Sequence, residues 1–216
     1  DIDSTPNSSS FRRLNRSRSN SMSSFKYRRT DENNYGILKG NGIGTIQEPF
    51  IKLKNVFESK EIPTNIGFNI EVKYPMIDEA EDFKLPAYYT ELNTFCDKIL
   101  ECVYEYAQPG RKIIFSTFHP ETSLMLANKQ SCYPVFFLTD CGVTRMADAR
   151  CNSVQAAIRF AKIAGLSGLV TNSDPIIEAP GLVKVIKNAG LLLFTYGKSN
   201  NKTENVQLQE RAGVDA

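Results

Sequence analysis

Hydrophobic positions along residues 45–216 follow two spacings that replace each other at regular intervals. Short apolar runs predict strands, and apolar residues spaced three and four positions apart predict helices. Strands are expected at 67–73, 112–117, 133–140, 166–171 and 191–197. Helices are expected at 50–57, 87–107, 120–129, 152–165, 179–190 and 203–213. Strands therefore alternate with helices through this part of the chain.

This alternation predicts an α/β fold, because nearly continuous apolar strands are typical of a parallel sheet covered on both faces. A (β/α)8 barrel and an open doubly wound sheet both fit it. No glycine-rich phosphate loop follows any expected strand, which disfavours a nucleotide-binding sheet. The chain begins without methionine, and residues 214–216 look like the start of a further strand. We therefore expect a (β/α)8 barrel of the TIM type, incomplete in this piece of chain and cut at both ends.

Residues 1–44 break the pattern, because they are rich in Ser, Asn and Arg and poor in apolar residues. Such a segment cannot bury enough apolar surface to offset its chain entropy, so a disordered insert is expected. Ser19 and Ser21 each follow an arginine by three positions, a spacing used by basic-directed kinases, so regulatory phosphorylation is the alternative. The sparse aromatic residues provide no stacking platform, and no nucleic-acid partner is expected.

Charge and cysteine content narrow the class of protein. The formal net charge of +2 indicates no particular charged partner. The five cysteines form no CxxC pair and no metal-type spacing with His119, so we expect reduced thiols in an intracellular, cytoplasmic protein. No apolar run approaches the roughly 18 residues of a membrane span. His119 precedes a proline at an expected helix start, a position where a lone histidine is expected to be structural.

Polar residues gather where the expected strands end, which is where a (β/α)8 barrel builds its active site. Glu71 and Lys73 stand out, because residues two apart in a strand point the same way. A carboxylate suits a hard cation such as Mg²⁺ or Ca²⁺, and a lysine beside it suits a phosphate oxygen. A mutual salt bridge at the barrel rim fits the spacing equally well. The other polar strand ends are Ser116, Thr117, His119, Thr139, Asp140, Thr171, Asn172, Ser173, Thr195 and Tyr196.

These sequences resemble the glycerophosphodiester phosphodiesterase family. GFNIEVKYPM is similar to the central motif of the family. The runs KIIFSTFHPETSLMLANKQSCYPVFFLTD, AIRFAKIAGLSGLVTNSDPI, LVKVIKNAGLLLFTYGKSNN and ENVQLQERAGVDA are similar to its fungal cytosolic members, which cleave glycerophosphocholine. The resemblance covers residues 45–216 and implies a metal-dependent (β/α)8 barrel. It also implies an SPX domain and ankyrin repeats in the same parent chain, with residues 1–44 as a variable insert.

The resemblance implies roles for four residues. Glu71 corresponds to the glutamate that ligates the divalent metal, Mg²⁺ or Ca²⁺. Lys73 corresponds to the lysine that contacts the substrate phosphate. Phe118 corresponds to the aromatic residue after the fourth strand, and Phe194 stands where many bacterial relatives have a tryptophan near the substrate glycerol. Both phenylalanines are therefore expected to bind substrate.

The resemblance also implies that part of the catalytic machinery lies upstream. The two catalytic histidines, the HRG and ENT motifs and an ExD metal pair precede the insert in the family, and none occurs in residues 1–44. His119 matches neither histidine, so this piece alone is expected to be inactive and its open barrel poorly stable. The full-length parent is expected to hydrolyse glycerophosphodiesters, forming glycerol 3-phosphate and choline from glycerophosphocholine. The competing hypothesis is a degenerate domain in a phosphate-signalling regulatory protein that acts by binding.

Overall fold

The computed structural model of the protein describes residues 47–63, 65–76 and 90–216. The insert expected at residues 1–44 lies outside them. The strands are β1 (Phe68–Glu71), β2 (Ile113–Thr117), β3 (Val135–Thr139), β4 (Gly168–Asn172) and β5 (Leu192–Tyr196). The helices are α1 (Gln47–Glu58), α3 (Leu92–Tyr106), α4 (Pro120–Lys129), α5 (Val154–Ile163), α6 (Ser173–Glu178), α7 (Gly181–Asn188) and α8 (Thr203–Ala212). Two short 3₁₀ helices are η3 (Ala149–Cys151) and η4 (Lys198–Asn201).

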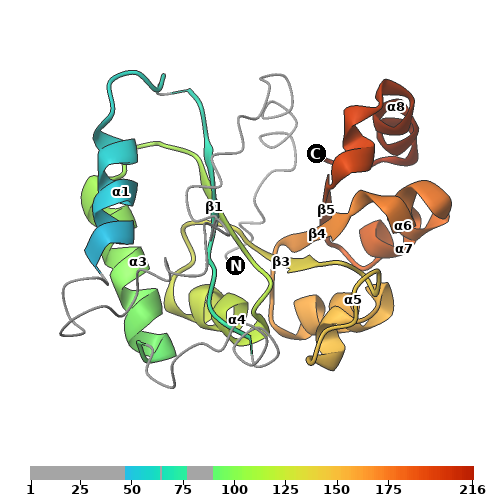
Figure 1. The fold of residues 1–216 in the computed structure, drawn as a ribbon, viewed down its shortest axis with the longest axis horizontal. Helices are drawn as coiled ribbons and strands as arrows, with labels where there is room; N and C mark the ends of the chain where they lie inside the picture. The colour runs from blue at the N-terminus through green and yellow to red at the C-terminus, as the bar shows by residue number, and fades with distance from the viewer. Residues whose placement is uncertain (1–46, 64, 77–89) are drawn as a thin grey trace, which may run out of the picture.

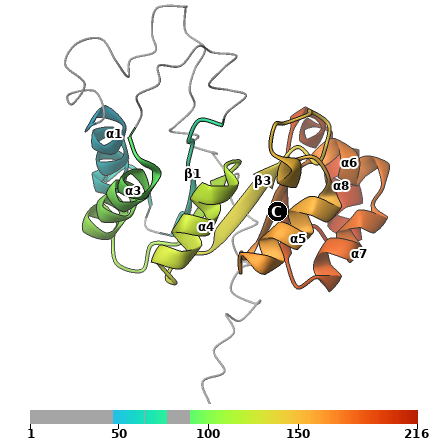
Figure 2. The ribbon, with the colours of Figure 1, turned by 90° about the horizontal axis from the view of Figure 1, so that it is seen from below.

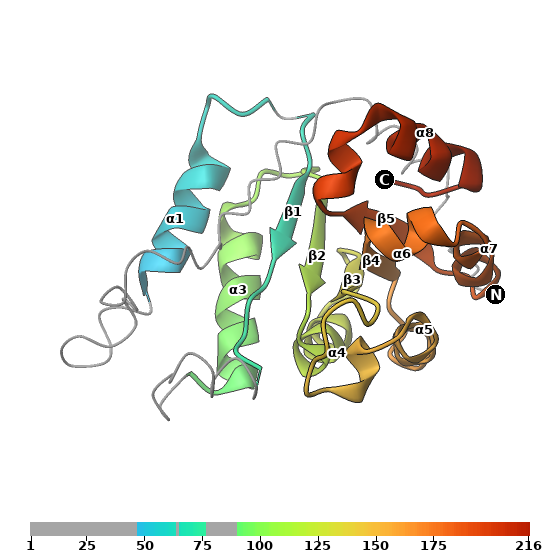
Figure 3. The same cartoon turned by 45° about the vertical axis from the view of Figure 1, so that its right-hand side comes forward.

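The five strands form one parallel sheet in the order β1-β2-β3-β4-β5, which is also their order along the chain. Figure 3 shows the strands side by side, with the arrowheads of β1 and β2 directed to the same end. The sheet curls into a half-barrel, and α1 with α3 lies on the opposite side of the molecule from α7 with α8 (Figure 1). The expected α/β class and the parallel strand order are confirmed.

The chain continues beside β5 after α8. The Asp215 backbone N–H donates to the Leu193 carbonyl at 2.9 Å, and the Thr195 N–H donates to the Ala216 carbonyl at 2.8 Å. Leu192 instead donates to the Ser167 carbonyl on the β4 side. Residues 215 and 216 therefore lie along the free edge of β5, where the sequence predicted the start of a further strand.

The two faces of the sheet are covered differently. On the outer face, α4 packs on β2 and β3, α5 on β3 and β4, and α7 on β5, while α1 packs against α3. Figure 2 shows α4, α5 and α7 following one another along this side. Strand residues such as Phe115, Phe137 and Leu169 join the helices in the main core. The inner face has its own apolar cluster, in which Phe136, Leu138 and Val170 are buried by other strand residues.

The pairing register defines a row of residues across the inner face. Glu71 pairs with Ser116, Ser116 with Phe136, and Phe136 with Gly168. A Cβ atom on Gly168 would lie 2.2 Å from the Leu192 carbonyl oxygen and 2.8 Å from a ring carbon of Phe136. Gly168 therefore lets β4 and β5 approach closely beneath the Phe136 ring. Glu71 stands at the β1 end of this row, so its side chain belongs to the inner face.

Caps define where several helices begin. The His119 ring accepts a hydrogen bond from the Thr122 N–H and Pro120 occupies the first turn of α4, which confirms the structural role expected for this histidine. Ser153 caps α5 in the same way. Helix α6 was not predicted, although Asn172 accepts from the Asp174 N–H at its start. The signal was present, because asparagine followed by an acid and a proline is a helix-start pattern.

Two further expectations concern thiols and membranes. All five cysteines are free, and Cys96, Cys102 and Cys151 are buried, as expected for reduced thiols. Burial raises the pKa of Cys96 and of Cys102 to about 11, so both stay protonated at neutral pH. Within the described residues, no helix is both long enough and apolar enough to cross a membrane.

Candidate active site

The carboxyl end of β1 places Glu71 and Lys73 in direct contact. The Lys73 Nζ lies 2.8 Å from a carboxylate oxygen of Glu71. The strand ends at Glu71, but the Val72 N–H still donates to the Ser116 carbonyl, which keeps this segment against β2. The Glu71 and Lys73 side chains are 22% and 37% exposed, so both charges remain partly accessible. The structure thus contains the salt bridge that the spacing allowed, in a form that a ligand can reach.

A second polar contact lies at the carboxyl ends of β3 and β5. The Tyr196 hydroxyl donates a short hydrogen bond to the Asp140 carboxylate. Burial raises the pKa of Tyr196, and the hydrogen bond to Asp140 and the charges of Asp140 and Glu71 raise it further. The phenol therefore stays protonated and remains a donor.

Phe118 joins this region from the segment after β2. Its ring meets the Tyr196 ring edge-on, with centroids 6.1 Å apart and an interplanar angle of 87°. It is partly buried and packs against both the inner-face cluster and the main core. The expected substrate-binding phenylalanine therefore lies beside Tyr196 and Asp140, at the end of the sheet that carries Glu71.

Phe194 occupies a different position from Phe118. Its ring stacks on Phe136, with centroids 4.6 Å apart and planes 23° from parallel. Its strand position pairs with Val170, and it belongs to the inner-face cluster with Leu138. Phe194 therefore lies inside the half-barrel, and Tyr196, two residues later on the same face of β5, is nearer the rim. Tyr196 is the aromatic residue of β5 that contacts polar groups.

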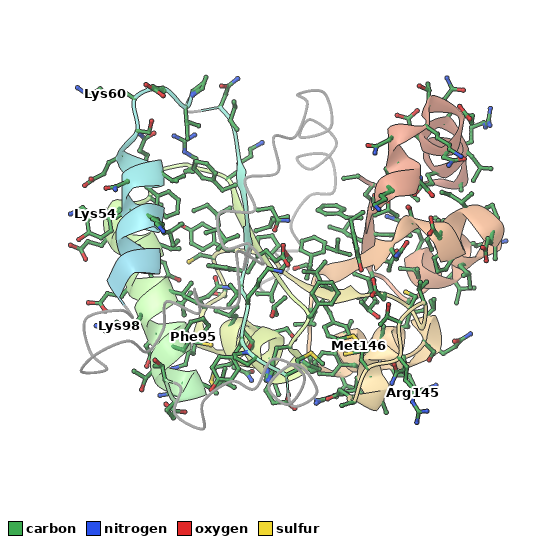
Figure 4. The ribbon with its side chains drawn as sticks, in the orientation of Figure 1. Lys54, Lys60, Phe95, Lys98, Arg145 and Met146 are labelled. Carbon is green, nitrogen blue, oxygen red and sulfur yellow. The ribbon has the colours of Figure 1, made fainter. Side chains whose placement is uncertain are left out.

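The loop between β3 and α5 holds Asp140 in place. Cys141 has a positive φ of 54°, rare for a residue with a side chain, and its N–H donates to the Thr139 hydroxyl at 3.0 Å. Gly142 follows at φ 91°, where a Cβ would lie 2.7 Å from the Asn152 carbonyl oxygen. The Asn152 side chain exchanges hydrogen bonds with Met146, which lies in this loop beside α5 (Figure 4). The turn after Asp140 is therefore tightly defined.

His119 borders this region but is engaged in structure. Its Nδ1 accepts from Thr122, and its ring lies edge-on to Tyr74 with centroids 5.1 Å apart. Burial lowers the pKa of His119, which favours the neutral ring that the cap requires. Glu121 lies 3.8 Å from the same nitrogen and is also ion-paired with Arg150. The only histidine of the sequence is thus an N-cap.

A divalent metal needs several oxygen or nitrogen ligands. Among the residues that the structure describes, no three His, Cys, Asp or Glu side chains converge on one point. Glu71 has the chemistry of one oxygen ligand and lies at the accessible end of the inner face. The described residues can therefore supply one carboxylate to a metal but not a complete coordination shell.

Sequence reasoning placed Asp140 and Tyr196 among the polar strand ends without assigning either a role. Nothing in their spacing brings them together, since 56 residues separate them. The signal that could have found them is the strand pairing, because β3, β4 and β5 are neighbours and their last residues meet at one edge. Periodicity identified the strands, but only their register shows which strand ends face each other.

Comparisons with known proteins agree with this arrangement. The chain is 44% identical over 181 residues to glycerophosphocholine phosphodiesterase GDE1 of Candida albicans, and 42% identical over 181 residues to glycerophosphocholine phosphodiesterase gde1 of Schizosaccharomyces pombe. These matches cover 84% and 83% of this chain but only 15% and 16% of those proteins. The chain thus spans about a sixth of the length of these curated relatives.

A solved structure supports the fold. The crystal structure of a glycerophosphodiester phosphodiesterase from Parabacteroides distasonis superimposes with a TM-score of 0.50 at 16% identity, over 77% of this chain and 56% of that one. The glycerophosphoryl diester phosphodiesterase family matches residues 2–216. The family match and the identity to the fungal relatives show that the chain belongs to the glycerophosphoryl diester phosphodiesterase family.

Proposed function

We propose that residues 45–216 form one wall of a catalytic barrel that hydrolyses glycerophosphodiesters, with glycerophosphocholine as the substrate and glycerol 3-phosphate and choline as the products. The observation that carries this proposal is the contact between Glu71 and Lys73 at the carboxyl end of the sheet. A partly exposed carboxylate beside an ammonium group offers one partner for a cation and one for an anion. The names of the fungal relatives support the choice of substrate.

Glu71 is proposed as one ligand of a divalent cation, Mg²⁺ or Ca²⁺, whose remaining ligands come from beyond the described residues. When bound, such a cation acts as a Lewis acid on phosphoryl oxygens. Lys73 would exchange its bond to Glu71 for a bond to a substrate phosphate oxygen and so offset the negative charge that the phosphate carries. Because Lys73 leaves Glu71 when phosphate arrives, the salt bridge of the structure and the proposed roles are compatible.

Phe118 and Phe194 are proposed to bind substrate in different ways. Phe118 is partly buried at the rim and can contact a ligand directly. Phe194 stacks on Phe136 inside the half-barrel and supports the floor of the site. No acid–base group for the reaction is assigned to this chain, because its single histidine caps α4. The chain alone is therefore proposed to be inactive.

The setting of the enzyme is proposed from the same likeness. A cytoplasmic location is supported by five free cysteines, since thiols stay reduced in that compartment. SPX and ankyrin domains are proposed for the same polypeptide, by resemblance to the fungal members of the family. The partner of the site is a small glycerophosphodiester.

The test is choline release from glycerophosphocholine by the full-length protein that carries this chain, with Mg²⁺ supplied. Glu71→Gln is expected to lower kcat/KM at least about 100-fold, because it removes a charged ligand of the cation. Glu101→Gln is the matched control, since Glu101 is ion-paired with Lys98 on the exposed side of α3. An unchanged kcat/KM in Glu71→Gln would show that Glu71 takes no part in the site. A folded but inactive parent would favour the regulatory, binding-only function.

A further inference from the structure

We propose that Asp140, Tyr196 and Phe118 form a binding subsite for a quaternary ammonium group, the cationic end of the substrate alcohol. This inference rests on the proposed function and adds to it the residues that select the headgroup. The three side chains come from β5 and from the segments that follow β2 and β3, and they meet at the carboxyl end of the sheet.

The carboxylate of Asp140 is the first reason to expect a cation at this subsite. Its partner in the structure is the uncharged hydroxyl of Tyr196. Glu71, by contrast, is ion-paired with Lys73, and Asp215 is ion-paired with Lys187. Among the described residues, no lysine or arginine forms an ion pair with Asp140. A half-buried carboxylate without a charged partner is a favourable site for a cation.

The surroundings of Asp140 indicate which kind of cation. A metal ion needs several oxygen or nitrogen ligands, whereas the described side chains that join Asp140 here are the aromatic rings of Tyr196 and Phe118. A quaternary ammonium group has no N–H to donate, so it needs negative charge and aromatic surface instead of hydrogen-bond acceptors. Tyr196 and Phe118 supply two rings set edge to face beside the carboxylate. The hydroxyl of Tyr196 also holds the carboxylate in one orientation.

The position of Asp140 relative to Glu71 and Lys73 also fits a choline ester. In a choline ester, a two-carbon spacer joins the phosphate to the ammonium group, so the two subsites must be neighbours. Glu71 ends β1 and Asp140 directly follows the end of β3, two strands away in the same parallel sheet, so both lie at the same end of the sheet. The substrate phosphate would lie at Lys73 and the cationic end at Asp140.

The test compares two substrates of the full-length protein. Glycerophosphocholine carries the cation, and the 3,3-dimethylbutyl ester of glycerol 3-phosphate is its isostere with an uncharged headgroup, in which carbon replaces the nitrogen. The preference for the choline ester, as a ratio of kcat/KM values, is expected to fall about tenfold in Asp140→Asn. Tyr196→Leu is expected to lower the same ratio, and Tyr196→Phe to lower it less because the ring remains.

Matched controls lie on α3. Asp97→Asn removes a carboxylate that is paired with Lys129, and Tyr104→Leu removes an exposed ring, so neither should change the ratio. A purely structural role for Asp140 would lower both kcat/KM values by the same factor and leave the ratio intact, which would overturn the subsite. Hydrolysis of neither ester by the wild-type protein would overturn the proposed function itself. If Tyr196→Leu fails to fold, the ratio of kcat/KM values in Tyr196→Phe and Asp140→Asn still tests the subsite.

Discussion

The two ends of the sheet use charged side chains in opposite ways. At the amino end, Arg111 is only 5% exposed and donates to the carbonyls of Pro63 and Ile66 at 2.6 and 2.8 Å. It also donates to the Gln108 side chain and lies over the Phe68 ring. At the carboxyl end, Glu71 and Lys73 are partly exposed and are held by each other, and the Asp140 carboxylate is held by Tyr196.

This difference suggests that the charge at the amino end stabilises the fold and that the charges at the carboxyl end are available for function. Arg111 gives most of its hydrogen bonds to the chain itself and has little left to offer a ligand. Lys73 has one exchangeable partner, Glu71, and can bind a ligand in its place. Barrels of this class place their chemistry at the carboxyl ends of the strands and their structural contacts at the other end. Substitutions at the amino end should therefore lower the free energy of unfolding, and those at the rim should change catalysis. The following substitutions test this division.

The largest expected effect is on catalysis, from Lys73→Met. Removing the ammonium group takes away the counter-charge proposed for the substrate phosphate, so kcat/KM for glycerophosphocholine should fall about 100-fold or more. The free energy of unfolding should change by less than about 1 kcal/mol, because the pair with Glu71 is partly exposed. Steady-state kinetics and urea unfolding of the full-length protein measure both. Lys98→Met, which removes an exposed pair on α3, is the control. Equal losses in the two variants would contradict the division.

Gly168→Ala is expected to cost about 3 kcal/mol of unfolding free energy, at the upper end of the range for overpacking. The added methyl group would meet the backbone of Leu192 and the ring of Phe136, and neither can move without disturbing the sheet. Gly181→Ala is the matched control, because nothing lies within 4 Å of its added carbon. That control should be neutral or slightly stabilising. Urea unfolding that shows a loss below about 1 kcal/mol for Gly168→Ala would mean that β4 and β5 are not so close.

Arg111→Met is expected to lower the free energy of unfolding by about 2 kcal/mol. The substitution keeps the aliphatic stem over Phe68 but leaves two partly buried carbonyls without their charged donor. Lys112→Met, at the exposed neighbouring position, should change stability by no more than about 0.5 kcal/mol. The ratio of kcat/KM for the choline and dimethylbutyl esters should not change in Arg111→Met. A changed ratio would connect the amino end of the sheet to headgroup selection.

The smallest effect is a pH dependence from His119. Its pKa is lowered in the folded state, chiefly by burial, so above the ordinary value of 6.5 the ring is neutral in both states and the cap is intact. As the pH falls below 6.5, the unfolded chain takes up the proton first, and stability decreases. From about pH 7.5 to about pH 5, the wild type should lose more free energy of unfolding than His119→Asn, whose amide oxygen still caps α4. Identical pH profiles of urea unfolding would exclude this role.

The sequence by itself determined the order and type of most elements. Hydrophobic periodicity placed all five strands and six of the helices, since 2-residue and 3.6-residue repeats arise from local backbone geometry. Some predicted bounds were wider than the observed ones, as 87–107 against Leu92–Tyr106, whereas 50–57 was narrower than the observed Gln47–Glu58 and 120–129 matched. The short helix α6 was missed, because six residues contain too few turns to show a period.

The sequence also identified Glu71 and Lys73 as neighbours, because their contact depends only on a spacing of two. Only the tertiary structure decided the rest of the rim. The meeting of Asp140 with Tyr196 and of Phe118 with Tyr196 depends on which strands are adjacent and in what register, and Phe194 turns inward to Phe136 for the same reason. Local patterns contain no information on such pairings, because the free energy that selects them comes from packing the whole sheet against its helices.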